Sequence, residues 1–120
     1  MMPTSDGRDP ANLLPLTTAM FHVLVALTDE ELHGYAIIKQ VSARTSGAVE
    51  LGTGTLYGII KRLLADGLAV ESPRRPAAGD DERRRYYRLT PFGRKVVTAE
   101  LVRLEGMVKA ARGTRSLRKA

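Results

Sequence analysis

The sequence contains no cysteine and no tryptophan, and it has only two histidines and two phenylalanines. Without cysteine the chain can form neither a disulfide framework nor a thiolate metal site, which fits a reducing compartment. Two histidines, His22 and His33, argue against a dedicated transition-metal site, so we expect no bound metal or other cofactor. No Ser-His-Asp order and no pair of catalytic carboxylates stands out, and we therefore expect no enzymatic activity.

Long apolar runs and a secretion signal are also lacking. No stretch of the chain approaches the ~20 consecutive apolar residues that a membrane helix needs. The first residues, Met1 to Asp9, do not show the charged-then-apolar order of a signal peptide. We therefore expect a cytoplasmic protein without membrane association.

Basic charge is confined to the later part of the chain. Residues 1–32 hold one basic and five acidic side chains, a net charge of −4, whereas residues 33–120 hold 18 basic and 8 acidic ones, a net charge of +10. This asymmetry indicates a polyanionic partner. The alternative is a basic surface that serves solubility only.

The length of 120 residues and a hydrophobic fraction of 43% predict one folded domain. Residues 1–15 lack periodicity and are rich in Pro, Gly, Asp and Asn, which predicts a flexible N-terminal arm. Residues 16–90 hold the folded domain, residues 91–113 a single long helix, and residues 114–120 a basic tail.

Apolar periodicity and capping residues predict three helices in the domain. The first begins near Leu16, with Thr17 or Thr18 as its cap. The second begins at His33-Gly34 and ends at Ser46-Gly47. The third runs from about Thr53 to Ala65, with a one-sided apolar stripe at Leu56, Ile59, Ile60, Leu63 and Leu64.

A small β-hairpin and a long helix follow. Short strands are predicted from Leu68 to Glu71 and from Tyr86 to Leu89, separated by a loop with two prolines and a glycine. Thr90 caps the last helix and Pro91 takes its first position. The apolar residues of this helix repeat with a coiled-coil spacing, at Val97, Leu101, Leu104 and Val108. The predicted fold class is thus mainly α with a small β-hairpin, a winged helix-turn-helix followed by a long C-terminal helix.

The third helix has the features of a DNA-reading element. Its start, Gly52-Thr53-Gly54-Thr55, is small enough for close approach of a phosphate backbone, and the two threonines can donate to phosphates or base edges. Tyr57, Lys61 and Arg62 lie opposite or beside the apolar stripe, and Lys61 and Arg62 could contact phosphate or guanine of DNA. The alternative is an ordinary amphipathic helix with solvated charges. A P-loop is not proposed, because the Gly-Lys-Ser/Thr element is missing.

The loop between the two strands favours DNA contact. It carries arginines that suit a narrow minor groove or phosphates: Arg74, Arg75, Arg83, Arg84 and Arg85. Acidic residues at positions 80–82 neutralise part of this charge, so the alternative is a solvated charge run.

At this point the chain resembles the PadR family of bacterial transcriptional regulators, over roughly residues 16–112. The resemblance rests on segments that keep one order along the chain: Leu16-Thr17, His33-Gly34-Tyr35-Ala36-Ile37, Gly54-Thr55-Leu56-Tyr57, Lys61-Arg62-Leu63, Asp66-Gly67-Leu68 and Arg84-Arg85-Tyr86-Tyr87-Arg88-Leu89-Thr90. A single C-terminal helix is similar to the family's shorter subgroup.

The resemblance implies a homodimer, mostly a repressor, that binds inverted repeats near a promoter and is nucleoid-associated when bound. It implies DNA contacts by Tyr35, Thr53, Thr55, Tyr57 and Lys61, with Arg83 to Arg85 in the wing; Tyr35 could equally be a core tyrosine. It also implies that the C-terminal helix is a dimerisation helix that packs against the partner's first helix. The dimerisation residues would then be Leu16, Met20, Leu24, Val97, Leu101, Leu104 and Val108.

Some members of the family bind planar drugs or phenolic acids between subunits, which implies a small hydrophobic or aromatic effector. A sandwich against tryptophan is excluded because the chain has none. The remaining candidates are Phe21, Phe92 and Met107, whose alternative role is ordinary packing.

Two other functions compete with a sequence-specific regulator. The winged helix could bind an acidic protein partner, or it could coat DNA without sequence preference, which predicts a steep salt dependence.

Overall fold

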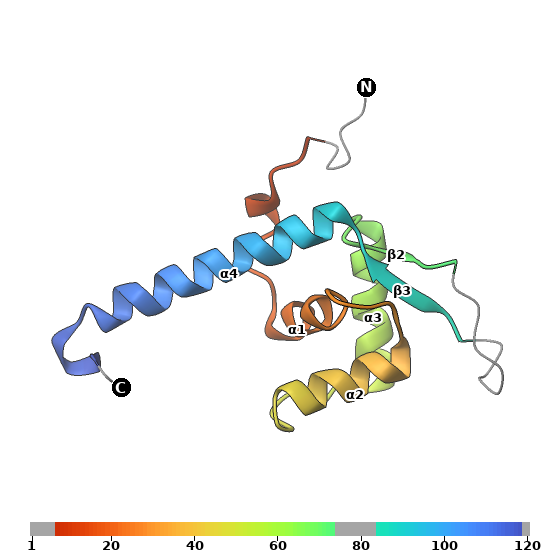
Figure 1. Cartoon of the computed structure of the whole chain (residues 1–120), viewed down its shortest axis with the longest axis horizontal. Coiled ribbons are helices and arrows are strands. Elements are labelled where there is room, and N and C mark those ends of the chain that lie inside the picture. The colour runs from red at the N-terminus through yellow and green to blue at the C-terminus, as the bar shows by residue number, and fades with distance from the viewer. Residues whose placement is uncertain (1–6, 74–83, 119–120) are drawn as a thin grey trace.

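Four α-helices and three short strands form the described part of the chain, residues 7–73 and 84–118 of a computed structural model (Figure 1). The helices are α1 (Thr18–Ala26), α2 (Gly34–Arg44), α3 (Thr53–Ala65) and α4 (Pro91–Arg112). The strands are β1 (Leu32–His33), β2 (Ala69–Glu71) and β3 (Tyr86–Leu89). Two short 3-10 helices flank them, η1 (Pro10–Leu13) and η2 (Arg115–Leu117). The predicted fold class, a mainly helical winged helix with a long last helix, is confirmed.

Capping side chains fix where the helices begin. The hydroxyl of Thr17 accepts a hydrogen bond from the Met20 amide at 3.1 Å, and Nδ1 of His33 accepts one from the Ala36 amide at 3.2 Å. Thr90 accepts from the Gly93 amide at 2.9 Å and donates to the Gly67 carbonyl at 2.6 Å. The Thr90 hydroxyl therefore starts α4 and also ties it to the turn after α3.

The three strands form one antiparallel sheet in the order β1-β3-β2. His33 pairs with Tyr86 and Leu32 with Tyr87, while Val70 pairs with Arg88 on the other side of β3. Strand β1 was not predicted from the sequence. The start of α2 is thereby attached directly to the sheet.

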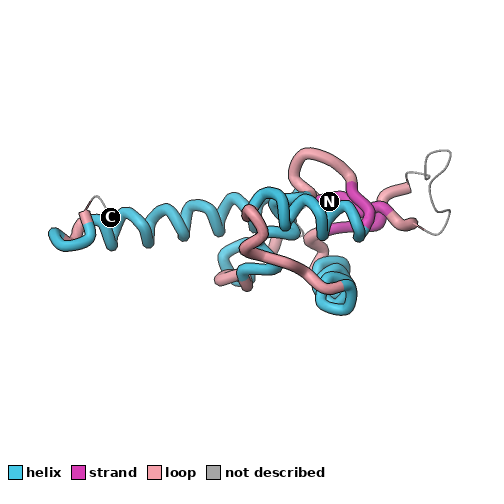
Figure 2. The backbone as a smooth tube through the Cα atoms, turned by 90° about the horizontal axis from the view of Figure 1, so that it is seen from below, coloured by secondary structure: helices cyan, strands magenta, loops and turns pink. Residues whose placement is uncertain are grey.

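The core lies where α1, α2, α3 and the first half of α4 meet. Its apolar side chains that are fully buried come mainly from the four helices and include Val23, Leu24, Ile37, Val41, Leu56, Leu63, Phe92 and Val96. The second half of α4 projects from this body, as two views at right angles show (Figures 1 and 2).

The segment before α1 lies against the body, whereas the sequence predicted a flexible arm over residues 1–15. Helix η1 packs against α4. Arg8 donates to the carbonyl of Asp66 at 2.7 Å, and its guanidinium lies 4.1 Å from the ring centroid of Phe92. These long-range contacts leave no periodic signal in the sequence. Residues 1–6 lie outside the described part.

Candidate nucleic-acid interface

Helix α3 presents a continuous exposed face built from small and polar residues. Leu56, Ile60 and Leu63 are buried and hold the opposite face in the core. The exposed side carries Thr53 and Thr55 in the first turn, Tyr57 in the second and Lys61 in the third. A Cβ atom on Gly54 or Gly58 would meet nothing within 4 Å. An extended partner can therefore approach the backbone of this helix closely.

Arg62, which was predicted to contact DNA, points toward the end of α3. Its Nε atom lies 3.1 Å from a carboxylate oxygen of Asp66, one turn further along the helix. The Arg62 side chain is largely exposed, so the guanidinium keeps access to solvent, but its direction is set by the acid at the helix end.

The start of α2 lies beside α3 and the sheet. The ring of His33 packs edge-on against Tyr86 with centroids 5.3 Å apart, which adds to its capping role. Tyr35 is 60% exposed, and the ammonium of Lys39 lies 5.4 Å from the centroid of its ring. The ring of Tyr35 thus lies at the surface, which does not fit the alternative of a core tyrosine.

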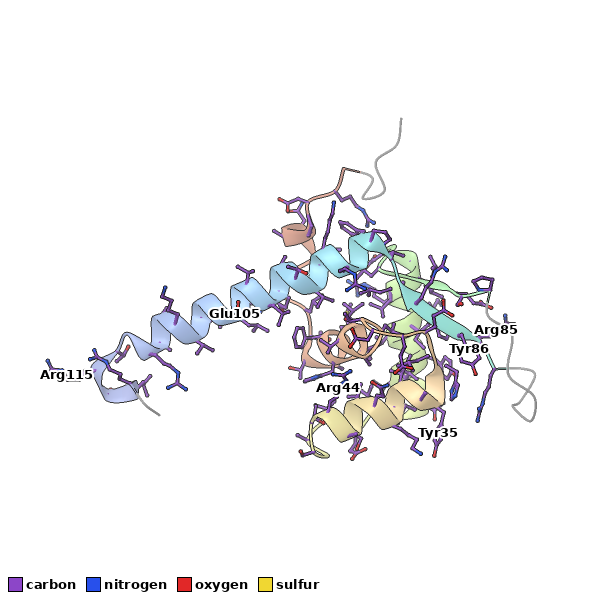
Figure 3. All side chains as sticks on the ribbon, in the orientation of Figure 1. Tyr35, Arg44, Arg85, Tyr86, Glu105 and Arg115 are labelled. Atoms are coloured by element: carbon purple, nitrogen blue, oxygen red, sulfur yellow. The ribbon has the colours of Figure 1, made fainter. Side chains whose placement is uncertain are left out.

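The described part of the wing carries two arginines, which lie near the start of α2 and near α3. Arg84 and Arg85 directly precede β3. Arg85 donates to a carboxylate oxygen of Glu71 on β2 at 2.9 Å, and this hydrogen bond raises the pKa of the guanidinium. Figure 3 shows Tyr35 and Arg85 at one end of the molecule, with Arg115 at the other. Arg83, with Arg74 and Arg75, lies outside the described residues.

A cavity of about 290 Å³ opens where these elements meet. Its described lining comes from the start of α2, from α3 and from the wing strand, and contains no acidic residue: His33, Gly34, Tyr35, Tyr57, Arg84, Arg85 and Tyr87. Burial raises the pKa of Tyr87, and the neighbouring Tyr57 raises it further, so the Tyr87 hydroxyl stays protonated at neutral pH. The four predicted residues Tyr35, Tyr57, Arg84 and Arg85 are brought together here.

The residues predicted to form a dimer fall into two groups. Leu24 and Val97 are buried within the single chain and have almost no surface left for a partner. Leu16, Met20 and Leu104 are half-buried, and Leu101 and Val108 are exposed. The apolar stripe of α4 is thus buried in the chain's own core near the start of the helix and exposed to solvent near its end. The predicted dimerisation surface is therefore reduced to the residues that are not fully buried.

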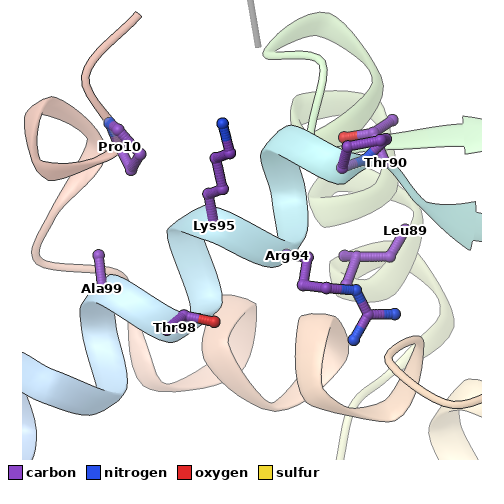
Figure 4. Close-up of a pocket in the computed structure, with 8 residues that line it drawn as sticks. Pro10, Leu89, Thr90, Arg94, Lys95, Thr98 and Ala99 are labelled. Carbon is purple, nitrogen blue, oxygen red and sulfur yellow. The ribbon is translucent and has the colours of Figure 1, made fainter. Parts of the chain in front are cut away.

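The three effector candidates do not converge. Phe92 is buried beneath Arg8, which corrects its expected place in an open pocket. Phe21 is half-buried against His22, and Met107 lies exposed beyond the body, with Arg103 donating to its sulfur. A larger cavity of about 820 Å³ lies between Pro10 and the start of α4, beside Lys95 and Ala99 (Figure 4), and contains none of the three.

Two residues that matter for geometry were missed by sequence reasoning. Glu100 is a buried carboxylate that joins α4 to the segment before α1, and Gly34 makes room for the ring of Tyr57. Neither gives a sequence signal, except that an acid within the apolar part of α4 breaks the pattern.

Within the described ranges, no group of three or more His, Asp or Glu side chains is arranged to hold a metal ion. None of the helices described there combines the length and apolar character that a membrane span requires.

A helical core, a three-stranded antiparallel sheet and an exposed third helix followed by a wing define a winged-helix protein. Comparison with known families matches residues 23–99 to the transcriptional regulator PadR-like family. The chain belongs to this family, whose members are transcriptional regulators and not enzymes.

Individual relatives agree with this assignment. A transcriptional regulator of Mycobacterium tuberculosis is 35% identical over 95 residues, which cover 79% of this chain and 83% of the relative. A transcriptional regulator from Clostridium thermocellum has a similar structure, with a TM-score of 0.66 and 25% identity over 80% of this chain and 91% of that one. Bacillus subtilis PadR, solved in complex with operator DNA, shares the fold with a TM-score of 0.62 and 22% identity over 73% of this chain and 49% of that one.

Proposed function

We propose that this protein is a sequence-specific DNA-binding regulator that acts as a homodimer on an inverted repeat, most simply as a cytoplasmic, nucleoid-associated repressor. The observation that carries the proposal is the continuous surface formed by the exposed face of α3 and the arginines that precede β3. On this surface, hydrogen-bond donors suited to base edges lie beside cations suited to phosphates. None of the described residues that line the cavity between them is acidic.

In this arrangement α3 enters the major groove and the wing contacts the neighbouring backbone or minor groove. Thr53, Thr55 and Tyr57 reach base edges or phosphates, and Lys61 lies one turn further along. Two such helices in a dimer read half-sites about 34 Å apart, one turn of B-DNA. Bacillus subtilis PadR, which shares the fold, was solved in complex with operator DNA, and this supports DNA as the partner.

Release by a small hydrophobic or aromatic effector stays a prediction. Such a ligand would change affinity for DNA only by binding one spacing of the two helices better than another. Phe21 and Met107 are the candidates that keep exposed surface.

The first test is a selection of bound genomic fragments by the purified protein at physiological salt. We expect an inverted repeat to be recovered. Bound fragments without a shared motif would support a DNA-coating protein, and no bound fragments would support the protein-interaction module.

A matched pair of lysines then tests the surface. Lys61→Ala removes a cation from the exposed face of α3, and Lys95→Ala removes one from α4, outside the proposed surface. We expect Lys61→Ala to weaken operator binding roughly tenfold, as for loss of one phosphate or base contact. Lys95→Ala should change it less than about twofold, and equal losses would contradict the proposed surface.

A further inference from the structure

The cavity of about 820 Å³ lies between the segment before α1 and one face of the first half of α4. The α4 residues that line it follow the three- and four-residue spacing of a single helix face: Pro91, Arg94, Lys95, Thr98 and Ala99. Its volume falls within the range of about 300–1,000 Å³ that is usual for small-molecule sites. It lies apart from the exposed face of α3 and from the wing.

The wall opposite α4 is held in place at both of its ends. Arg8 donates to the carbonyl of Asp66 at 2.7 Å, and its guanidinium lies over the ring of Phe92. At the other end, the Leu16 amide donates to the carboxylate of Glu100 at 3.0 Å. Pro10, the first residue of η1, lies between these anchors in the chain and lines the cavity. The wall is therefore formed without a ligand, as is usual for small-molecule sites.

The apolar part of the described lining is aliphatic. Rings of Pro10 and Pro91 and methyl groups of Leu89 and Ala99 contribute to it, and no aromatic side chain is among the described lining residues. A planar aromatic ligand would therefore find no ring to stack on, whereas an alkyl chain gains affinity from burial alone. Pro91 and Ala99 lie about 12 Å apart along the helix at 1.5 Å per residue, which suits an extended chain.

Lysine 95 supplies the charge that this apolar surface presents to a ligand. No acidic residue is among the described residues that line the cavity. Arg94 donates to the carbonyl of Thr28 at 2.9 Å, which directs its guanidinium toward the end of α1. Lys95 makes no hydrogen bond or ion pair within the part of the chain that the structure describes. It extends from α4 between Pro10 and Thr90 in the view of Figure 4.

We propose that this cavity binds a medium-chain aliphatic carboxylate. The carboxylate pairs with the ammonium of Lys95, and the alkyl chain lies along the face of α4 from Pro91 to Ala99, against Pro10. An anion with an apolar body matches both the charge and the lining. The proposal does not depend on the DNA-binding function, and its site contains neither Phe21 nor Met107.

The first test is an NMR titration of the full chain with octanoate, at concentrations below those at which octanoate forms micelles. We expect saturable binding, and roughly fivefold weaker binding of hexanoate because two methylene groups are lost from a partly open cavity. No saturable binding of octanoate would overturn the proposal. Tighter binding of the planar aromatic acid cinnamate than of octanoate would overturn the aliphatic class.

A matched pair of lysines on α4 tests the charge. Lys95→Met and Lys109→Met both keep an unbranched side chain and remove one cation from an exposed position of the same helix. We expect Lys95→Met to weaken octanoate binding about threefold to tenfold, while its affinity for neutral 1-octanol stays unchanged. Lys109→Met should leave both affinities as in wild type. Equal octanoate affinities in the two variants would contradict the pairing with Lys95.

The position of the chain is tested by nuclear Overhauser effects between octanoate and methyl groups of the protein. We expect contacts from the octanoate methylenes to the methyls of Leu89 and Ala99. Contacts only to Leu101, Leu104 and Val108 would place the chain on the projecting half of α4 and overturn the site. These measurements use no DNA, so an absence of operator binding would remove the regulator and leave the carboxylate site standing. Operator binding without octanoate binding would remove the carboxylate site alone.

Discussion

Two adjacent leucines of α3 differ in how far they are buried. Leu63 is fully buried against the core, whereas the next residue, Leu64, keeps 39% of its surface exposed. The same chemical deletion at these two positions therefore separates core packing from surface coverage.

Leu63→Ala should lower the free energy of unfolding by about 2–5 kcal/mol, because it removes buried methyl groups and leaves a cavity. Leu64→Ala should cost less than about 1 kcal/mol. Chemical denaturation monitored by circular dichroism measures both. Similar losses for the two variants would place Leu64 in the core of the protein as it exists in solution.

Glu100 is a buried carboxylate with three hydrogen-bond donors. Arg103 donates to both of its oxygens from the next turn of α4, and the Leu16 amide donates to one of them at 3.0 Å. The bonds from Arg103 lower the pKa of Glu100, burial opposes them, and the Leu16 amide lowers the pKa further. The ionised form is therefore the one that the fold prefers.

A lowered pKa makes this carboxylate a source of stability at neutral pH. The contribution is present above the ordinary glutamate pKa of about 4.3 and is lost as pH falls below it toward the folded value. Glu100→Gln should therefore be less stable than wild type at pH 7, and the gap should shrink below about pH 4. Thermal unfolding across this pH range measures it. A gap that stays constant with pH would mean that the charge of Glu100 is not what the fold uses.

At the scale of elements, the two halves of α4 have different surroundings. Its first half lies against the turn after α3, where a Cβ on Gly93 would come within 2.0 Å of the Leu68 carbonyl oxygen. Its second half projects from the body (Figure 1), and a Cβ on Gly106 would meet nothing within 4 Å.

Gly93→Ala should destabilise the protein by at least about 2 kcal/mol, because helix and turn must move apart. Gly106→Ala should stabilise it by up to about 1 kcal/mol, because alanine favours the helix. Denaturation curves of the two variants provide the comparison. A tolerated Gly93→Ala would show that α4 is not held at the distance seen in the structure.

The helices could be predicted from the sequence because their signals are local. Thr17 and Thr90 cap their helices, and α4 runs from Pro91 as predicted. Of the predicted apolar stripe of α3, Leu56, Ile60 and Leu63 are buried in the core, whereas Leu64 is exposed. Strand β1 could not be predicted, because its two residues are defined only by pairing with distant β3. The docking of η1 on α4 was missed for the same reason.

The spacing of apolar residues also does not show whether an apolar helix face is covered by its own chain or by a partner chain. Leu24, Val97 and Phe92 carry the same signal as Leu101 and Val108, yet the first three are covered by their own chain. At the candidate interface, residue type and family resemblance selected Tyr35, Tyr57, Arg84 and Arg85. Gly34 could not be selected, because its contact with Tyr57 depends on how two helices approach each other.

At the scale of the whole molecule, the projecting half of α4 carries the remaining apolar surface. Leu101 and Val108 lie on one side of it and Val102 on another, all exposed. The first two continue the stripe that is predicted to dimerise.

Replacing Leu101 and Val108 with glutamate should convert a dimer into a monomer, because like charges would face each other across the interface. Val102→Glu makes the same chemical change on a different face and should leave the dimer intact. Light scattering after size exclusion at micromolar concentration distinguishes the two. A wild-type protein that is already a monomer under these conditions would remove the dimer from the proposed function.

The length of the projecting half of α4 determines how far its tip moves when the helix tilts. The helix is held by the body as far as Glu100, and the 12 residues beyond it, 101–112, extend about 18 Å at 1.5 Å per residue. A tilt of about 10° about the Glu100 anchor moves the far tip by about 3 Å, close to the 3.4 Å step of one base pair. For two copies joined at these tips, α4 is a lever that converts a small rotation into a shift of one base pair.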